Sequence, residues 1–270
     1  MSGRLPTEVV VERFEHNGVS LVVDTLGGAG TRHVVFLHGW GANRESLRGI
    51  ATLFQTEYRV HLLDLPGFGE APLPPPGWDT INYSDLVQQY LLERTGGSVV
   101  LVGHSFGGRL AIRLAARRLP HIRAIVLMGV PGLPLRAWSS RWMRSRWIRG
   151  LRRALTVARP ITGPAPLAWH SKRFGSKDYL AAGDLRSVLV KVVNEDLTES
   201  ARAIACPTFL LWGDEDRETP PELAHRYRAL VAGPATVELL PHKDHYLFTG
   251  TGAHLCASRI RAWLPLHVES

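Results

Sequence analysis

The chain has 270 residues, of which 45% are hydrophobic and 21% charged, and its formal net charge at pH 7 is +8. This composition is that of an ordinary globular protein and excludes a wholly disordered or collagen-like chain. No apolar run reaches the roughly 18 residues that a transmembrane helix needs. The first residues also lack the pattern of a secretory signal, so the two cysteines, Cys206 and Cys256, are predicted to be free thiols of a cytoplasmic protein.

The positive charge is concentrated in one part of the chain. Residues 94–177 contain 15 Arg and 2 Lys and no carboxylate, so this part carries +17 and the rest must sum to −9 to give +8. The positive electrostatic field of such a segment favours an anionic partner. Each arginine taken singly is explained equally well by a position on a solvated helix face. Peripheral contact with anionic lipid at the inner membrane surface therefore stays open. No zinc-finger spacing or RNA-binding aromatic signature accompanies the charge, so no nucleic-acid partner is predicted.

Strand and helix patterns alternate along most of the chain. Apolar runs predict strands at 9–14, 19–24, 33–37, 59–63, 98–102, 122–128, 207–212 and 236–240. Helical patterns are found at 44–54, 83–93, 106–118, 220–230 and 253–263. The first two strands flank Asn17-Gly18, a dipeptide typical of a tight hairpin turn. The alternation that follows predicts an α/β fold with a mostly parallel central sheet and helices on both faces.

One glycine-rich turn joins a predicted strand to a predicted helix, and its sequence is Gly103-His104-Ser105-Phe106-Gly107. A nucleophilic serine must project from a very sharp turn, and only small residues fit two positions before it and two positions after it. The helix begins at the serine, so its free amides lie under any oxyanion that forms there. A glycine-rich turn without chemistry would share the bare pattern, but the flanking strand and helix favour a nucleophile elbow at Ser105.

Four motifs together resemble the α/β-hydrolase fold superfamily, in its subgroup with a helical cap domain. They are Leu37-His38-Gly39-Trp40-Gly41, Asp64-Leu65-Pro66-Gly67-Phe68-Gly69, Gly103-His104-Ser105-Phe106-Gly107-Gly108 and Trp212-Gly213-Asp214-Glu215-Asp216. Their order and spacing match the family, and the resemblance spans nearly the whole chain. The sequence has no HExxH, no CxxC and no glycine-rich phosphate loop after the first strands, so we predict no metal and no cofactor.

The resemblance implies an acid after the strand at 207–212, in the family order of serine, acid and histidine. Three carboxylates compete there, Asp214, Glu215 and Asp216. The family pattern Gly-x-x-Asp selects Asp216, whereas Asp214 is expected to bind backbone amides of the turn.

The base is expected in the loop after the last strand. His245 fits the family position and His242 is its rival, because it follows the strand more closely. In the family, a histidine at the position of His38 supports its loop, and one at the position of His104 packs without transferring protons. The oxyanion would be bound by the backbone amides of Phe106 and Trp40, and the Trp40 side chain could also line the acyl pocket.

The alternation of strands and helices is interrupted over residues 131–200. We expect residues 1–130 and 201–270 to form the hydrolase core and residues 131–200 to form a cap over the strand ends. Trp or Leu recurs there at about helical spacing, with arginines between, at Trp138, Trp142, Trp147, Leu151 and Leu155 and at Arg141, Arg144, Arg149, Arg152 and Arg153. Such a helix packs its aromatic stripe on the core or lies at an anionic membrane interface, and packing is the commoner arrangement.

These features predict a serine hydrolase that cleaves carboxylic ester, or related acyl, bonds of a small to medium substrate through an acyl-enzyme at Ser105. A serine at the elbow excludes relatives that use Asp there, the haloalkane dehalogenases and epoxide hydrolases. Two alternatives stay open: a C–C bond hydrolase of ring-cleavage dienones, and a lysophospholipase or lipase at a membrane surface. A non-catalytic binding module is disfavoured, because the three residue types of a catalytic triad occur in the family order.

Overall fold

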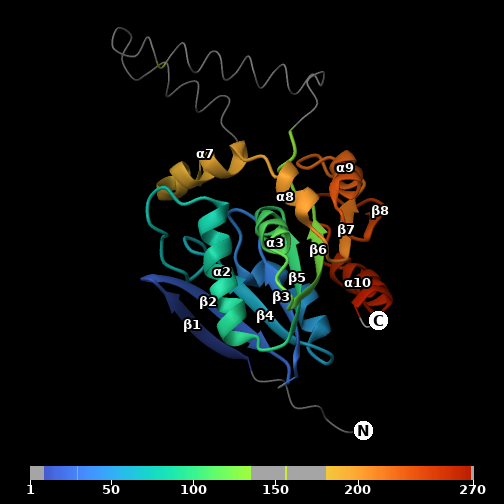
Figure 1. Cartoon of the computed structure of the whole chain (residues 1–270), viewed down its shortest axis with the longest axis horizontal. Helices are drawn as coiled ribbons and strands as arrows, with labels where there is room; N and C mark the ends of the chain where they lie inside the picture. Colours follow the sequence, from blue (N-terminus) through green and yellow to red (C-terminus); the bar gives the residue numbers. More distant parts are fainter. Residues whose placement is uncertain (1–8, 29, 135–155, 157–180, 269–270) are drawn as a thin grey trace.

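The computed structural model describes residues 9–28, 30–134, 156 and 181–268 (Figure 1). The strands are β1 (Val10–His16), β2 (Val19–Leu26), β3 (Arg32–Leu37), β4 (Arg59–Asp64), β5 (Ser98–His104), β6 (Ile122–Met128), β7 (Thr208–Gly213) and β8 (Ala235–Leu240). They form one sheet in the order β1-β2-β4-β3-β5-β6-β7-β8. The strands from β4 to β8 in this order run parallel, and β1 and β2 are antiparallel to their neighbours. The predicted mostly parallel sheet is thus confirmed.

Helices cover both faces of this sheet (Figure 1). They are η1 (Arg44–Leu47), α1 (Arg48–Ala51), η2 (Thr52–Phe54), α2 (Thr80–Arg94), α3 (Phe106–Ala116), η3 (Gly183–Leu185), α7 (Arg186–Asn194), α8 (Thr198–Ala203), α9 (Glu222–Leu230) and α10 (Gly252–Val268). On one face α2, α3, α8 and α9 share a buried apolar core with the strands, and on the other face α1 and α10 share a second core. Strand side chains alternate between the two, as Val35 and Phe36 do in β3.

The predicted hairpin is present at the start of the sheet. Asn17 and Gly18 connect β1 to β2, and His16 pairs with Val19. Both turn residues have positive φ, 51° for Asn17 and 75° for Gly18. This backbone twist matches that of the flanking strands, which explains the Asn-Gly dipeptide at this position.

The bounds of every helical segment differ from the sequence predictions, and those of α10 extend five residues beyond the predicted end at 263. In two segments, local polar contacts account for the difference. The helix α2 begins three residues before the predicted start at 83, where the Asp79 side chain accepts hydrogen bonds from the amides of Ile81 and Asn82. The single helix predicted over 44–54 is instead a 3-10 turn, one α-helical turn and a second 3-10 turn. Its first turn is closed by Asn43, whose side chain accepts from the amide of Glu45 at 3.1 Å.

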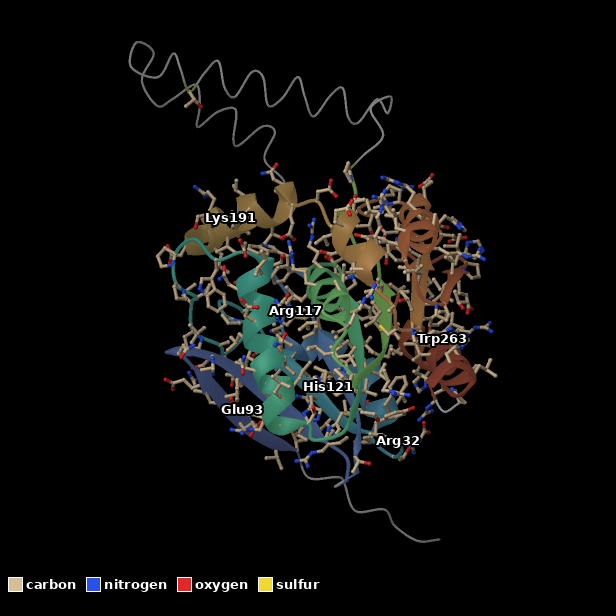
Figure 2. All side chains as sticks on the ribbon, in the orientation of Figure 1. Arg32, Glu93, Arg117, His121, Lys191 and Trp263 are labelled. Carbon is tan, nitrogen blue, oxygen red and sulfur yellow. The ribbon has the colours of Figure 1, made fainter. Side chains whose placement is uncertain are left out.

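The predicted cap is described only in part. Residues 135–155 and 157–180, which include the Trp and Arg pattern between Trp138 and Leu155, lie outside the described residues. The described end of the segment contains α7 and α8. Figure 2 labels Lys191 on α7, and its ammonium group donates to the carbonyl of Gly77 in the loop before α2. This end of the segment therefore contacts the core, while the division of the chain into core and cap stays a prediction.

Side-chain contacts also join the helices on one face of the sheet. Arg117, labelled in Figure 2, follows α3 and donates to Asp85 and Gln88 of α2, both at 2.6 Å. Cys206 and Cys256 are free cysteines, as predicted. None of the helices within the described part of the chain combines the length and the hydropathy that crossing a membrane requires.

Candidate active site

The turn between β5 and α3 holds Ser105 in a strained conformation. Its φ is 47° and its ψ is −107°, a region that side-chain-bearing residues rarely adopt and that the surrounding structure must enforce. A Cβ atom at Gly103 would lie 2.6 Å from the carbonyl oxygen of Gly107, and one at Gly107 would overlap the backbone of Leu37. The backbones of β3, β5 and α3 approach so closely here that only glycine fits at both positions. The structure thus explains the spacing Gly-x-Ser-x-Gly.

Asp216 and His245 form a buried pair beyond the ends of β7 and β8. The Nδ1–H of His245 donates to Oδ2 of Asp216 at 2.8 Å, and the two residues are only 5% and 3% exposed. Because Nδ1 carries this proton, Nε2 is the ring atom that can accept another.

The carboxylate of Asp216 receives further hydrogen bonds from its own turn. The Thr219 hydroxyl donates to Oδ2 at 2.6 Å, and the amides of Glu218 and Thr219 donate to Oδ1 at 2.9 and 2.8 Å. Burial alone would raise the pKa of Asp216, but hydrogen bonds from His245 and Thr219 outweigh it and leave the pKa below its ordinary value. Asp216 is therefore ionised at neutral pH.

The structure separates Asp216 and His245 from their rivals. Asp214 is exposed, and among the described residues its side chain makes no hydrogen bond to a backbone amide, contrary to the expectation. The amides of Glu218 and Thr219 in this turn bind Asp216. His242 has an 89% exposed side chain and lies 3.2 Å from Glu215. Among the described residues, only His245 of these two histidines contacts Asp216.

Ser105 and His245 line the same cavity, which has a volume of about 40 Å³. Its other lining residues are Gly39, Trp40, Ala42, Ser46, His104, Glu218, Tyr246 and Phe248. His104 helps to hold the loop that carries His245, because its Nε2–H donates to the carbonyl of His245 at 3.0 Å. Burial lowers the pKa of His104 to about 3, so this ring is neutral and its Nε2 is occupied.

Trp40, which lines this cavity, packs against Phe106, the residue that follows Ser105. Their rings pack edge to face with centroids 5.4 Å apart. No backbone hydrogen bond between described residues uses the amide of either one, so both amides are free to bind another acceptor. The predicted elbow residues and the predicted amide donors are thus neighbours of Ser105.

A model of the alpha/beta hydrolase family matches residues 34–257, which is most of the chain. The chain belongs to this family. It is also 28% identical over 214 residues to a pimeloyl-[acyl-carrier protein] methyl ester esterase of Proteus mirabilis (strain HI4320), a match that covers 73% of this chain and 79% of the relative.

Solved structures share the fold of this α/β hydrolase at low sequence identity. A membrane phospholipase A that is a bacterial virulence factor superposes with a TM-score of 0.75 at 21% identity, over 95% of this chain and 86% of the other. An esterase from Exiguobacterium antarcticum superposes with a TM-score of 0.71 at 20% identity, over 98% of this chain and all of the other.

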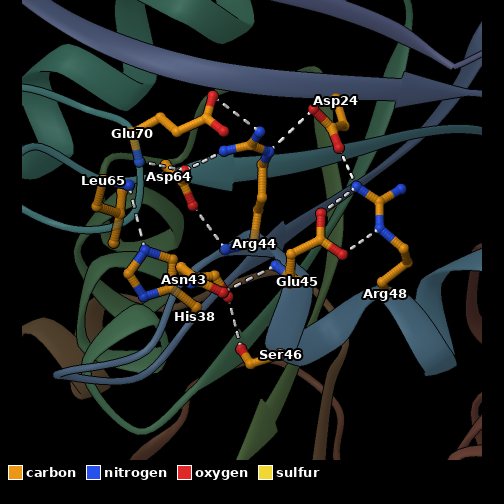
Figure 3. A network of polar contacts seen from close by, with 10 residues as sticks. All are labelled: Asp24, His38, Asn43, Arg44, Glu45, Ser46, Arg48, Asp64, Leu65 and Glu70. Atoms are coloured by element: carbon orange, nitrogen blue, oxygen red, sulfur yellow. Dashed lines mark hydrogen bonds and ion pairs between the residues drawn. The ribbon is translucent and has the colours of Figure 1, made fainter.

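The loop that carries Trp40 is held by a buried polar network that the sequence analysis did not predict (Figure 3). Arg44 is at its centre: its amide donates to Asp64 at 2.7 Å, and its guanidinium binds Asp24, Asp64 and Glu70. Buried charges are stable only when paired in this way. The signal in the sequence was Asp24, the one charged residue of β2, a strand that is buried along its whole length.

His38 belongs to the same loop and plays a supporting part. Its Nδ1–H donates to the carbonyl of Gly39 at 2.8 Å. Its Nε2 accepts from the amide of Leu65 at 3.2 Å, a contact drawn in Figure 3. Burial lowers the pKa of His38 to about 4, so the ring stays neutral. With both nitrogens occupied, His38 joins the loop after β3 to the loop after β4.

Proposed function

We propose that this α/β hydrolase is a serine hydrolase that cleaves carboxylic ester bonds, or related acyl bonds, of a small to medium substrate. The observation that carries the proposal is that strained Ser105 and the His245–Asp216 pair meet at one cavity. The similarity to an esterase over 73% of the chain supports an ester as the bond that is cleaved. The site residues proposed are Ser105 as nucleophile, His245 as base and Asp216 as acid.

Acylation would begin with attack of the Ser105 hydroxyl on the substrate carbonyl, while Nε2 of His245 takes the hydroxyl proton. Asp216 stabilises the imidazolium that forms, because it is ionised and bound to Nδ1. The backbone amides of Trp40 and Phe106 would stabilise the oxyanion. The C–O bond then breaks, and the alcohol leaves with the proton from Nε2.

Deacylation would repeat these steps with water. A water molecule gives a proton to Nε2 of His245 and attacks the acyl carbon, and Ser105 regains its proton when the acid is released. The neutral rings of His38 and His104 do not compete as bases, because burial keeps the pKa of each low and both have hydrogen-bonded nitrogens. His245 is therefore the base in both halves of the reaction.

A second cavity supports a substrate of small to medium size. It has a volume of about 360 Å³ and lies between the loop after β3, the loop after β4 and residues 181–185. Trp40 and Ala42 line both this cavity and the smaller one at Ser105. We propose that the acyl chain occupies this space, with the Trp40 ring as the wall between the two cavities.

The test combines an active-site label with a substrate panel. A fluorophosphonate probe should label the native chain and Ser46→Ala, which removes a neighbouring hydroxyl in the same cavity, but not Ser105→Ala. Hydrolysis of p-nitrophenyl esters from acetate to palmitate should fall by at least about 10³-fold in Ser105→Ala. Equal labelling of the native chain and Ser105→Ala would refute the proposal.

The same panel decides between the proposal and its alternatives. A ring-cleavage dienone and a lysophospholipid are assayed beside the esters. Turnover of the dienone far above the best ester would replace ester hydrolysis with C–C bond hydrolysis. Preference for the lysophospholipid, with sedimentation on anionic liposomes that high salt abolishes, would establish the membrane-surface alternative.

A further inference from the structure

We propose that Glu218 makes this site prefer esters whose alcohol portion is cationic over esters whose alcohol portion is anionic. This inference rests on the proposed function, because it concerns the group that leaves when Ser105 is acylated. Sequence reasoning did not identify Glu218, and nothing in the family motifs marks it.

Glu218 lies beside the ring atom that would transfer the proton. Its Oε2 is 3.7 Å from Nε2 of His245. Its backbone amide donates to Oδ1 of Asp216 at 2.9 Å, which fixes the turn that carries the side chain. The Glu218 side chain is 58% exposed, so its carboxylate is in contact with solvent on one side and close to the buried ring of His245 on the other.

Glu218 also lines two cavities that meet at His245. One is the cavity of Ser105, and the other has a volume of about 350 Å³ and is lined as well by Glu215, Arg217, Asp244, His245 and Tyr246. The cavity of about 350 Å³ gives the alcohol portion room on the side of His245 where Glu218 lies. Arg217 opposes the acidic side chains there, but Glu218 is the one that approaches Nε2.

The chemistry of acylation fixes the distance between Glu218 and the leaving group. Nε2 must donate its proton to the leaving oxygen, so in a productive complex that oxygen lies about 3 Å from Nε2. The oxygen is then within about 7 Å of the Glu218 carboxylate, and a charge two carbons further along the alcohol can come as near. Every alcohol portion therefore passes through the field of this carboxylate.

Coulomb's law gives the size of the effect. Two unit charges about 6 Å apart, at the effective dielectric constant of about 40–80 that suits an exposed group, change a rate constant by about three- to tenfold. The net charge of the chain, +8, acts in the opposite direction, because it attracts anionic substrates. A preference for a cationic alcohol would thus be caused by the carboxylate of Glu218 and not by the net charge of the protein.

The test uses three esters with one acyl group, the one that the p-nitrophenyl panel finds best. Their alcohols are choline, its neutral isostere 3,3-dimethylbutanol and the anionic 2-hydroxyethanesulfonate. The ratio of kcat/KM for the choline ester to kcat/KM for the neutral ester should be three- to tenfold higher in the native chain than in Glu218→Gln. The ratio of kcat/KM for the sulfonate ester to kcat/KM for the neutral ester should be higher in Glu218→Gln than in the native chain. Both differences between the native chain and Glu218→Gln should be smaller in 0.5 M NaCl.

The matched control is Glu199→Gln, which removes the same charge from an exposed side chain that contacts Arg202 and lines neither of the two cavities that Glu218 lines. It should keep the native ratios within about twofold. Equal ratios in the native chain and Glu218→Gln, or an equal change in Glu199→Gln, would overturn the inference. The proposed function is judged separately: it survives if the neutral ester is hydrolysed by the native chain and not by Ser105→Ala.

Discussion

Lowering the pH from 7 to 5 should destabilise the fold through buried histidines. Burial lowers the pKa of His38 to about 4 and the pKa values of His61 and His104 to about 3. All three are at most 2% exposed. Because an unfolded histidine has a pKa near 6.5, the unfolded chain takes up protons that the folded chain refuses. Stability is therefore present above about pH 6.5 and is lost as the pH falls from there toward the folded pKa values.

The magnitude follows from the size of these shifts. Between pH 7 and pH 5 each of the three histidines removes about 2 kcal/mol from the free energy of unfolding, since one pKa unit corresponds to about 1.4 kcal/mol. Together they remove about 6 kcal/mol, which is comparable with the whole stability of a typical domain, about 5–15 kcal/mol. The lowered pKa of Asp216 acts in the same direction only at more acidic pH, below its ordinary value of 3.8.

The assay is urea unfolding followed by tryptophan fluorescence at pH 7, 6 and 5. His61→Gln should remove about a third of the pH dependence, whatever it does to the stability at pH 7. In the native chain this ring contacts His33 at 2.9 Å and the Tyr90 hydroxyl at 2.7 Å. His225→Gln, at an exposed position on α9, should leave the pH dependence unchanged. If the free energy of unfolding of the native chain falls by less than about 1 kcal/mol between pH 7 and pH 5, the reasoning is refuted, because the buried rings would then take up protons as readily as in the unfolded chain.

Three further predictions concern the site. Asp216→Asn should lower kcat by about 10³–10⁴-fold in ester hydrolysis while the chain stays folded by circular dichroism, because the His245 ring would lose its ionised partner; a loss below tenfold would contradict the assignment. Gly107→Ala should lower the Tm by at least several degrees, because its Cβ would overlap the Leu37 backbone, whereas Gly28→Ala, with nothing within 4 Å, should not; equal Tm values would show that the turn tolerates a side chain. Trp40→Ala should move the best p-nitrophenyl ester to a longer acyl chain, because it joins the two cavities that its ring lines and keeps its backbone amide; an unchanged preference would place the acyl chain elsewhere.

The strands were predicted from sequence within about two residues, because apolar runs in a buried parallel sheet carry a strong local signal. The helix ends were predicted less well, because side chains decide them. Asp79 starts α2 before the apolar pattern begins. In the short turns at 44–54, Asn43 caps the first turn and Arg44 binds Asp24 of β2 and Asp64 of β4. Contacts of this second kind join residues 20 positions apart and leave no local pattern.

In the candidate site too, local motifs were readable from the sequence and contacts between distant residues were not. The motifs singled out Ser105 and favoured Asp216 and His245 over Asp214 and His242, but they could not show that the Asp216 and His245 side chains are in contact. Glu218 was not predicted, because its significance is a distance to one atom of His245. A carboxylate two residues after another carboxylate has no meaning in the sequence until the turn between them is known.

Glu195, at the end of α7, has consequences for engineering. Its carboxylate is bound by Arg113 of α3 and by the Thr80 hydroxyl of α2, and Arg109 of α3 lies 3.8 Å away. Glu195 thus joins the end of α7 to α3, the helix that begins directly after Ser105. A chimera that exchanges residues 135–180 for the corresponding segment of another hydrolase should therefore retain α7 through Glu195 as its junction, so that the graft does not disturb the elbow.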